Sequence, residues 1–209
     1  LLKKGTQILR ESNLKQFSEI SSVSSVGGGP IGGGWAAHFL AKGLKVISYL
    51  HDKNEKKLFL NIVESAWQSL VQIGLKKNAS LNNLEITFDL EHALSGTDFV
   101  QESIPEVLSI KQQFYKSIDT LLDEKIVVAS STSGLMISDI TKKCQTAFRA
   151  VVGHPFNPPY LLPLVEIVAG ENTKPEVIAW TEGFYRYFDK VPIVLKKEIP
   201  GFIATRLQE

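Results

Sequence analysis

The sequence has little cysteine: Cys144 is the single cysteine among 209 residues. One thiol cannot close a disulfide within the chain or build a cysteine-based metal site, which excludes a disulfide-stabilised secreted scaffold. The four histidines are too scattered for a metal site, so we predict no bound metal. The cysteine usage suits a reducing compartment and predicts a cytoplasmic location.

The chain also lacks an excess of charge of one sign and any long apolar run. Its 23 Lys and Arg against 22 Asp and Glu leave a formal net charge of +1. This balance creates no field that would draw the chain to nucleic acid or to an anionic membrane, so we expect neither as a partner. The longest apolar stretches, such as residues 161–168, fall far short of the roughly 20 residues that a membrane helix needs. A small-molecule substrate is the expected partner.

Short apolar or β-branched runs alternate with longer helical stretches. The runs that predict strands are residues 20–26, 45–50, 84–88, 99–101, 126–130, 148–153, 164–169 and 192–196. The stretches that predict helices are residues 33–41, 54–73, 106–122 and 175–188. This rhythm predicts an α/β fold, a Rossmann-type doubly wound and largely parallel sheet covered by helices. The first run holds four serines, which suit a core strand only if it is short or lies at an edge.

A glycine-rich loop follows the first predicted strand and directly precedes a helix. Residues 27–32, with the sequence GGGPIG, fit the pattern G-x-G-x-x-G. In that pattern the first glycine permits a tight turn, the second lets a pyrophosphate approach the backbone, and the third lets the helix pack on the sheet. Free N–H groups at the helix start face the phosphates. The alternative is a merely flexible turn. The predicted dinucleotide-binding residues of this loop are Gly27, Gly29, Pro30, Ile31 and Gly32.

The acid that usually holds the adenosine ribose is absent from its usual position. That position, at the end of the second strand about 20 residues after the loop, is occupied by Leu50, and the nearest acid is Asp52. Either Asp52 reaches the ribose because the strand end is displaced, or this contact is missing and NAD binds more weakly. Residues 50–57 contain no arginine that could pair with a 2′-phosphate. We therefore predict NAD, rather than NADP, as the cofactor.

A histidine and a glutamate lie in two apolar runs that are close in sequence. His154 stands where residues 151–153 break into a proline-rich loop, the usual location of catalytic groups in an open α/β sheet. Glu166 lies within the apolar run 164–168, where an isolated carboxylate is costly to bury. Pairing would remove that cost, orient the imidazole and prepare it as a general base. The alternative is a structural loop histidine and an edge-strand glutamate.

Several motifs, in the right order, resemble the NAD-binding domain of the L-3-hydroxyacyl-CoA dehydrogenase superfamily. These motifs are GHPFNP at 153–158, LVE at 164–166, SSTSGL at 130–135 and PGFI at 200–203. Residues 32–37, 101–106 and 160–164 look most like the L-carnitine dehydrogenase branch, with the L-gulonate dehydrogenase and lambda-crystallin branch close behind. The resemblance covers nearly everything from about residue 20 to residue 207.

The resemblance implies hydride transfer to NAD with a His/Glu dyad. His154 would take the proton from the 3-hydroxyl of the substrate, Glu166 would stabilise the imidazolium, and Ser133 would hydrogen-bond the reacting oxygen. Glu106 and Lys111 match the family's Glu and Lys near the nicotinamide ribose, with a solvated helix face as the alternative. The fatty acyl-CoA enzymes carry an asparagine where this chain has Thr205.

The resemblance also divides the chain. Residues 1–18 are expected to form an N-terminal extension, residues 19–199 the NAD-binding Rossmann domain, and residues 200–209 a hinge with the start of a truncated C-terminal domain. The resemblance implies that the rest of the family's all-helical C-terminal domain, which closes the substrate cleft and forms most of the dimer interface, is expected to be missing from this chain. We therefore expect a homodimer formed through that missing domain.

The second helical segment favours a small substrate. Residues 54–75 carry only Lys56 and Lys57 near their start, whereas the acyl-CoA enzymes bind CoA partly through a lysine-rich arm here. The expected substrate is a small, carnitine-like L-3-hydroxy acid, with a 3-hydroxyacyl-CoA left open. A quaternary ammonium would need aromatic faces, for which Trp35, Phe156 and Tyr160 are candidates. The competing hypothesis is a dinucleotide-binding but catalytically weak relative, as crystallins of this superfamily suggest.

Overall fold

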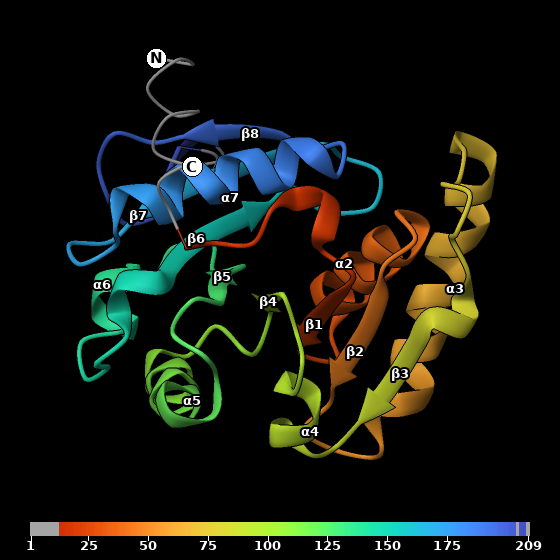
Figure 1. The fold of residues 1–209 in the computed structure, drawn as a ribbon, viewed down its shortest axis with the longest axis horizontal. Helices are drawn as coiled ribbons and strands as arrows, with labels where there is room; N and C mark the ends of the chain where they lie inside the picture. Colours follow the sequence, from red (N-terminus) through yellow and green to blue (C-terminus); the bar gives the residue numbers. More distant parts are fainter. Residues whose placement is uncertain (1–12, 204, 208–209) are drawn as a thin grey trace.

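A computed structural model describes residues 13–203 and 205–207 of the chain, and its strands form one eight-stranded sheet with helices on both faces (Figure 1). The strands are β1 (Ser22–Val26), β2 (Lys45–Tyr49), β3 (Leu84–Thr87), β4 (Phe99–Glu102), β5 (Val127–Ser130), β6 (Ala150–Pro155), β7 (Leu164–Ala169) and β8 (Val191–Val194). The helices are α2 (Pro30–Ala41), α3 (Glu55–Ile73), α4 (Leu90–Leu94), α5 (Leu108–Leu121), α6 (Ile137–Ile140) and α7 (Pro175–Tyr187). Each predicted strand overlaps an observed one.

The sheet has the order β3-β2-β1-β4-β5-β6-β7-β8. All neighbouring strands pair in parallel except β6 and β7, which are antiparallel. The chain moves outward from β1 to β2 and β3, then returns to β4 on the other side of β1. Strand order reverses between β1 and β4, and ligands of open α/β sheets bind outside the carboxyl ends of the strands at such a point. The predicted Rossmann-type, largely parallel sheet is confirmed.

Strand β1 is short, as expected, but it lies in the middle of the sheet and not at an edge. All five of its residues are buried, serines included. The hydroxyls are tolerated there because they donate to backbone carbonyls: Ser24 Oγ lies 2.5 Å from Ala93 O, and Ser25 Oγ lies 3.0 Å from Gly32 O. A buried hydroxyl that finds an acceptor avoids most of its desolvation penalty. The Ser25 bond also ties β1 to the first turn of α2.

The two faces of the sheet carry separate cores. One core packs α2, α3 and α7 against the sheet and is rich in aromatic rings, among which Phe99 and Phe184 lie 4.1 Å apart between centroids. The other packs α5 and α6 on the opposite face around Val100 and Ile118. Large aromatic side chains bury the most apolar area per residue, so this core contributes strongly to the stability of the domain.

The described part of the predicted N-terminal extension packs on the domain. Phe17, in a 3-10 turn, lies against Trp180 of α7 with ring centroids 5.7 Å apart. Lys15 pairs with Asp98 at 2.6 Å. The rest of that extension, residues 1–12, lies outside the described residues, as do residues 204, 208 and 209 of the predicted hinge segment. No helix in the described ranges is long and apolar enough to cross a membrane.

Candidate active site

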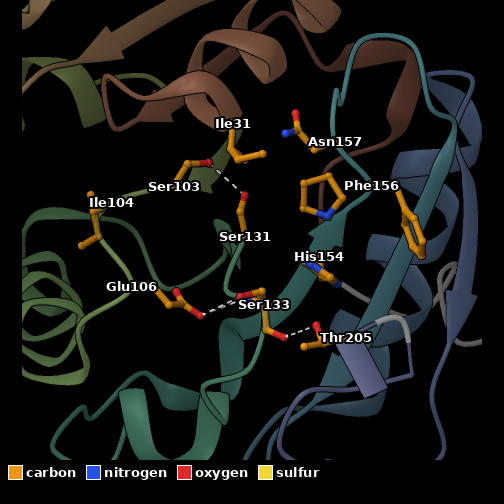
Figure 2. A pocket seen from close by; sticks show the side chains of 11 residues that line it. Ile31, Ser103, Ile104, Glu106, Ser131, Ser133, His154, Phe156, Asn157 and Thr205 are labelled. Carbon is orange, nitrogen blue, oxygen red and sulfur yellow. Dashed lines mark hydrogen bonds between the residues drawn. The ribbon is translucent and has the colours of Figure 1, made fainter. Parts of the chain in front are cut away.

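A cleft of about 410 Å³ opens at the carboxyl ends of the central strands (Figure 2). Its walls include Ile31 from the glycine loop, Ser103 and Glu106 after β4, Ser133 after β5, His154 from β6, and Thr205 near the C-terminus. The topology therefore brings residues predicted from distant parts of the sequence to one place. Nothing in the described part of the chain gathers three or more His, Cys, Asp or Glu side chains into a metal site.

The glycine loop is shaped by close backbone contacts. Gly27 has a φ of +118°, a conformation that side chains rarely allow. An added Cβ at Gly32 would collide with the carbonyl oxygen of Gly27, because the helix packs directly on the loop. Helix α2 begins at Pro30, earlier than the predicted start near Gly33. Pro30 favours this early start because its fixed φ suits the first helical position.

The same loop leaves space where a phosphate group would approach. An added Cβ at Gly29 would meet nothing within 4 Å. Gly29 is also the N-cap of α2, and the first turn of that helix contains no acidic residue. The free N–H groups and the positive end of the helix dipole favour an anion at this position. Fold packing alone does not require glycine here, so the open space fits the pyrophosphate of a dinucleotide.

Two acids follow β2 at positions displaced from the usual one, and one of them reaches this loop. Leu50 is fully buried just beyond β2, so no carboxylate occupies the usual ribose position. Asp52 is exposed and accepts a hydrogen bond of 2.8 Å from the backbone N–H of Asn54. Glu55, at the start of α3, reaches back to the loop: a Cβ on Gly28 would lie 2.7 Å from its Oε2. The sequence analysis missed Glu55, since the usual spacing points only to the strand end.

His154 and Glu166 form the pair that the sequence predicts. They are cross-strand partners in the antiparallel β6–β7 ladder, so their side chains lie on the same face. His154 Nδ1 lies 2.7 Å from Glu166 Oε2, and the Glu166 side chain is only 3% exposed. The other carboxylate oxygen accepts a 3.1 Å bond from the backbone N–H of Ile203. Because the carboxylate accepts, Nδ1 carries the hydrogen, and in the neutral imidazole the lone pair is then on Nε2.

Glu106 organises the loop that carries Ser133. Its Oε1 accepts the backbone N–H of Ser133 at 2.9 Å and that of Gly134 at 3.3 Å, together with the Thr132 hydroxyl at 2.5 Å. Partial burial raises the pKa of the Glu106 carboxyl, but the Thr132 hydroxyl, the nearby Lys111 ammonium and these N–H groups outweigh it, and the pKa lies below its ordinary value. Glu106 is thus an anion on the cleft wall.

Lys111 lies behind that wall and not on it. Its side chain is 1% exposed, and Nζ lies 2.5 Å from Glu102 Oε1 and 3.5 Å from Glu106 Oε2. The ammonium therefore neutralises two carboxylates from inside the domain. Direct contact between Lys111 and a ribose stays a prediction. Sequence analysis missed Glu102, although an acid at the end of a short apolar strand was a signal for a buried pair.

Of the three aromatic side chains considered for a cationic substrate, Phe156 lines the cleft. Trp35 is instead fully buried and stacked on Phe39 and Tyr185. Tyr160 faces a second cavity, next to Lys190. The structure therefore excludes Trp35 as a contact for ligand in this conformation.

Three further polar side chains in the cleft were not singled out from the sequence. Ser103 follows β4, Ser131 follows β5, and Asn157 follows β6. Two signals could have found them: each follows the carboxyl end of a strand, and each lies within a motif, at 101–106, 130–135 or 153–158, that resembles the family.

Taken together, the strand order, the glycine loop with its open approach and the polar cleft beside it define a dinucleotide-binding domain of the dehydrogenase class. The sequence profile of the family "3-hydroxyacyl-CoA dehydrogenase, NAD binding domain" matches residues 22–199. The chain belongs to this family, and NAD is its cofactor.

Sequence relatives and solved structures agree with this assignment. The chain is 44% identical over 190 residues to the L-carnitine dehydrogenase of Streptomyces coelicolor, covering 91% of this chain and 60% of the relative. It is 39% identical to that of Bacillus cereus, covering 92% and 59%. A solved NAD+-dependent dismutase, FHMPC 5-dehydrogenase, superimposes with a TM-score of 0.83 at 34% identity, covering 90% of this chain and 62% of that one.

The same fold occurs in 3-hydroxybutyryl-CoA dehydrogenase from Escherichia coli, with a TM-score of 0.83 at 25% identity. The match covers 90% of this chain and 40% of that one. The chain thus spans about 60% of the length of the L-carnitine dehydrogenases that it resembles.

Proposed function

We propose that this chain is the NAD-binding part of an enzyme that oxidises the 3-hydroxyl of a small L-3-hydroxy acid, with His154 as the general base. The observation that carries the proposal is the 2.7 Å contact between His154 Nδ1 and the buried Glu166, in the same cleft as Ile31 of the glycine loop. Membership of a family of NAD-dependent dehydrogenases supplies the reaction class.

His154 removes the hydroxyl proton. With Nδ1 bound to Glu166, the Nε2 lone pair is the acceptor, and the imidazolium that forms is stabilised by the adjacent carboxylate. Bound NAD would supply the acceptor for the hydride that leaves the carbon carrying the hydroxyl. Because Glu166 is buried, little water screens its charge, so its attraction for the imidazolium is stronger than at a surface.

Ser133 orients the reacting oxygen. Ser133 lines the same cleft as His154, and its backbone N–H is fixed by Glu106 at 2.9 Å (Figure 2). Its Oγ is only weakly engaged, 3.4 Å from Glu106, so a substrate oxygen can compete for its hydrogen.

The cofactor-binding residues follow from the loop and its neighbours. Gly27, Gly29, Pro30, Ile31 and Gly32 hold the pyrophosphate at the start of α2. Either Asp52 or Glu55 accepts the adenosine ribose hydroxyls, and the position of Glu55 against Gly28 favours Glu55. Glu106 contacts the nicotinamide ribose, and Lys111 acts through Glu106 because it is buried behind it.

The substrate is a carnitine-like acid rather than a CoA thioester. Relatives that are 44% and 39% identical to this chain carry the name L-carnitine dehydrogenase. Helix α3 has two lysines, Lys56 and Lys57 in its first turn, and no others that could offer charge to a CoA phosphate. The full-length enzyme is a homodimer in the cytoplasm, as the family resemblance implies.

The test measures NADH formation by the protein expressed from its complete reading frame, with L-carnitine, L-gulonate and 3-hydroxybutyryl-CoA as substrates. Preference for either hydroxy acid supports the proposal, whereas preference for the CoA ester overturns the substrate class. Undetectable turnover of all three, with NADH still bound, favours the catalytically weak dinucleotide-binding relative, for which Leu50 in place of the ribose acid is the supporting observation.

A further inference from the structure

A row of hydrogen bonds runs from the aromatic core to the cleft. The Tyr185 hydroxyl lies 2.6 Å from Gln101 Oε1, and Gln101 Nε2 lies 2.9 Å from Ser131 Oγ. Ser131 Oγ in turn lies 2.9 Å from Ser103 Oγ, where the row ends on the cleft wall (Figure 2). Tyr185 and Gln101 are fully buried. The direction in which the hydrogens point along this row decides whether Ser103 offers a ligand in the cleft a hydrogen-bond donor or an acceptor.

The orientation of the Gln101 amide sets the direction at the buried end. Its Nε2 also lies 3.4 Å from the carbonyl oxygens of Ala129 and Gly153, which can only accept. Turning the amide over would place Oε1 against these two oxygens. The NH₂ group therefore faces Ser131, and Oε1 accepts from the Tyr185 hydroxyl.

Ser131 passes this direction on. Its oxygen receives a hydrogen from Gln101 Nε2 and a second from the indole N–H of Trp35, at 3.2 Å. A hydroxyl oxygen has two lone pairs, so both are filled. The one remaining group is the hydrogen of Ser131 itself, which must be donated to Ser103. Ser103 is therefore an acceptor in this bond, and its own hydrogen is free to point into the cleft.

We propose that Ser103 is a specificity-determining residue that donates a hydrogen bond to an acceptor oxygen of the molecules bound in the cleft. The row of hydrogen bonds from Tyr185 leaves Ser103 with a hydrogen to donate. A ligand that places a carboxylate or amide oxygen next to the Ser103 hydroxyl is therefore favoured. The inference rests on the proposed function for the ligand class. The acceptor has two possible sources, the substrate carboxylate and the nicotinamide carboxamide of the cofactor.

The test compares Ser103→Ala with Ser103→Thr, which keeps the hydroxyl, in the full-length protein. Ser117→Ala is the matched control, because Ser117 is an exposed serine of α5 that bonds only its own helix at Gln113 O. Thermal unfolding first shows that each variant folds. NADH affinity is then measured by quenching of tryptophan fluorescence, and the KM for the hydroxy acid by NADH formation.

Loss of the donor by Ser103→Ala should weaken binding about 10- to 100-fold, the range for a hydrogen bond to a charged or strongly polar acceptor, with recovery in Ser103→Thr. A weaker NADH affinity places the acceptor on the cofactor. A raised KM with unchanged NADH affinity places it on the substrate. If folded Ser103→Ala matches the wild type in both measurements, the inference is wrong. Failure of the proposed function differs from this result, because the wild type itself would then form no NADH.

Discussion

His154 and Glu166 face each other across the β6–β7 pair, with Nδ1 and Oε2 2.7 Å apart. These are the two strands that break the parallel pattern of the sheet. An antiparallel register places the two side chains directly opposite each other, so the backbone holds the pair without relying on a flexible loop. Glu166 is buried on β7, whereas His154 lies near the end of β6, so its imidazole lines the cleft.

Removing the base should remove most of the turnover. His154→Gln keeps a polar side chain but cannot take a proton, and we expect kcat to fall about 10²- to 10⁴-fold with NADH affinity unchanged. Glu166→Gln should lower kcat less, because the imidazole remains. Steady-state NADH formation and a fluorescence titration give the two quantities. Equal turnover in His154→Gln and the wild type would contradict the assignment.

Alanine at two glycines of the loop should separate stability from cofactor binding. Gly32→Ala places a Cβ against the Gly27 carbonyl, so we expect a lower melting temperature. Gly29→Ala meets no protein atom within 4 Å and should melt like the wild type, but its methyl group fills the approach of the pyrophosphate and should weaken NAD binding. Calorimetry measures both melting and binding. Unchanged NAD affinity in Gly29→Ala would show that the pyrophosphate lies elsewhere.

The two displaced acids can be told apart by charge-removing variants. We expect Glu55→Gln to weaken NAD+ binding about tenfold and to narrow the preference over NADP+, since a carboxylate beside Gly28 repels a 2′-phosphate. The matched control is Asp52→Asn, because Asp52 is exposed and already accepts a hydrogen bond from the Asn54 N–H. This variant should change the affinity for either dinucleotide little. Calorimetric titration with both dinucleotides measures the effects. The reverse outcome would assign the ribose to Asp52.

Breaking the buried ion pair behind the cleft should destabilise the domain. Glu102→Gln leaves the Lys111 ammonium, which is 1% exposed, with Glu106 at 3.5 Å as its remaining carboxylate among the described residues and with the Ile104 carbonyl at 3.3 Å. We expect the free energy of unfolding to fall by about 3 to 5 kcal/mol. The double variant Glu102→Gln with Lys111→Met should recover part of this loss. Urea unfolding followed by circular dichroism measures both. Equal loss in the single and double variants would contradict the pairing.

Lys190 should make stability depend on pH. Burial, assisted by nearby Lys42, lowers the pKa of Lys190 from 10.5 to about 7, and Nζ donates to the backbone oxygens of Pro159 and Leu162. Between these two pH values the unfolded chain binds the proton and the folded chain does not, so this contribution to stability rises with pH across that window.

The matching variant is Lys190→Met. We expect the free energy of unfolding of the wild type, minus that of the variant, to grow between pH 7 and pH 9 by up to about 1.4 kcal/mol per pH unit. Urea unfolding at several pH values measures it. A difference that stays constant over that range would show that Lys190 remains charged in the folded state.

The strands and the glycine loop could be predicted because each rests on local pattern. Apolar runs bounded by turns identify strands, and the loop spacing depends on residues that are close in sequence. The position of β1 could not be inferred this way, since its serines are satisfied by Ala93 O and Gly32 O, which come from α4 and α2. Tertiary hydrogen bonds are invisible to a pattern of residue types.

The proposed site could be predicted only to a similar extent. A carboxylate in an apolar run pointed to a partner such as His154 for Glu166, and the family resemblance of residues 153–158 and 164–166 decided between this pair and a purely structural histidine and glutamate. The burial of Lys111 could not be predicted, because helical spacing does not show that Glu102 lies inside the domain as its partner. Glu55 was missed because α3 starts close enough to the loop for its first turn to replace a strand-end residue, a relation set by helix placement.

The short segment after Gly201 forms hydrogen bonds with two parts of the proposed site, through its backbone and one hydroxyl. The N–H of Ile203 holds Glu166 at 3.1 Å, and the Thr205 hydroxyl donates to the carbonyl of Ser133 at 3.0 Å. A shift of residues 203 and 205 by even one hydrogen-bond length would loosen the carboxylate that holds the proposed base and the loop of the proposed substrate-orienting serine in the same movement. The alignment of the proposed reacting groups is thus mechanically coupled to the position of these two residues.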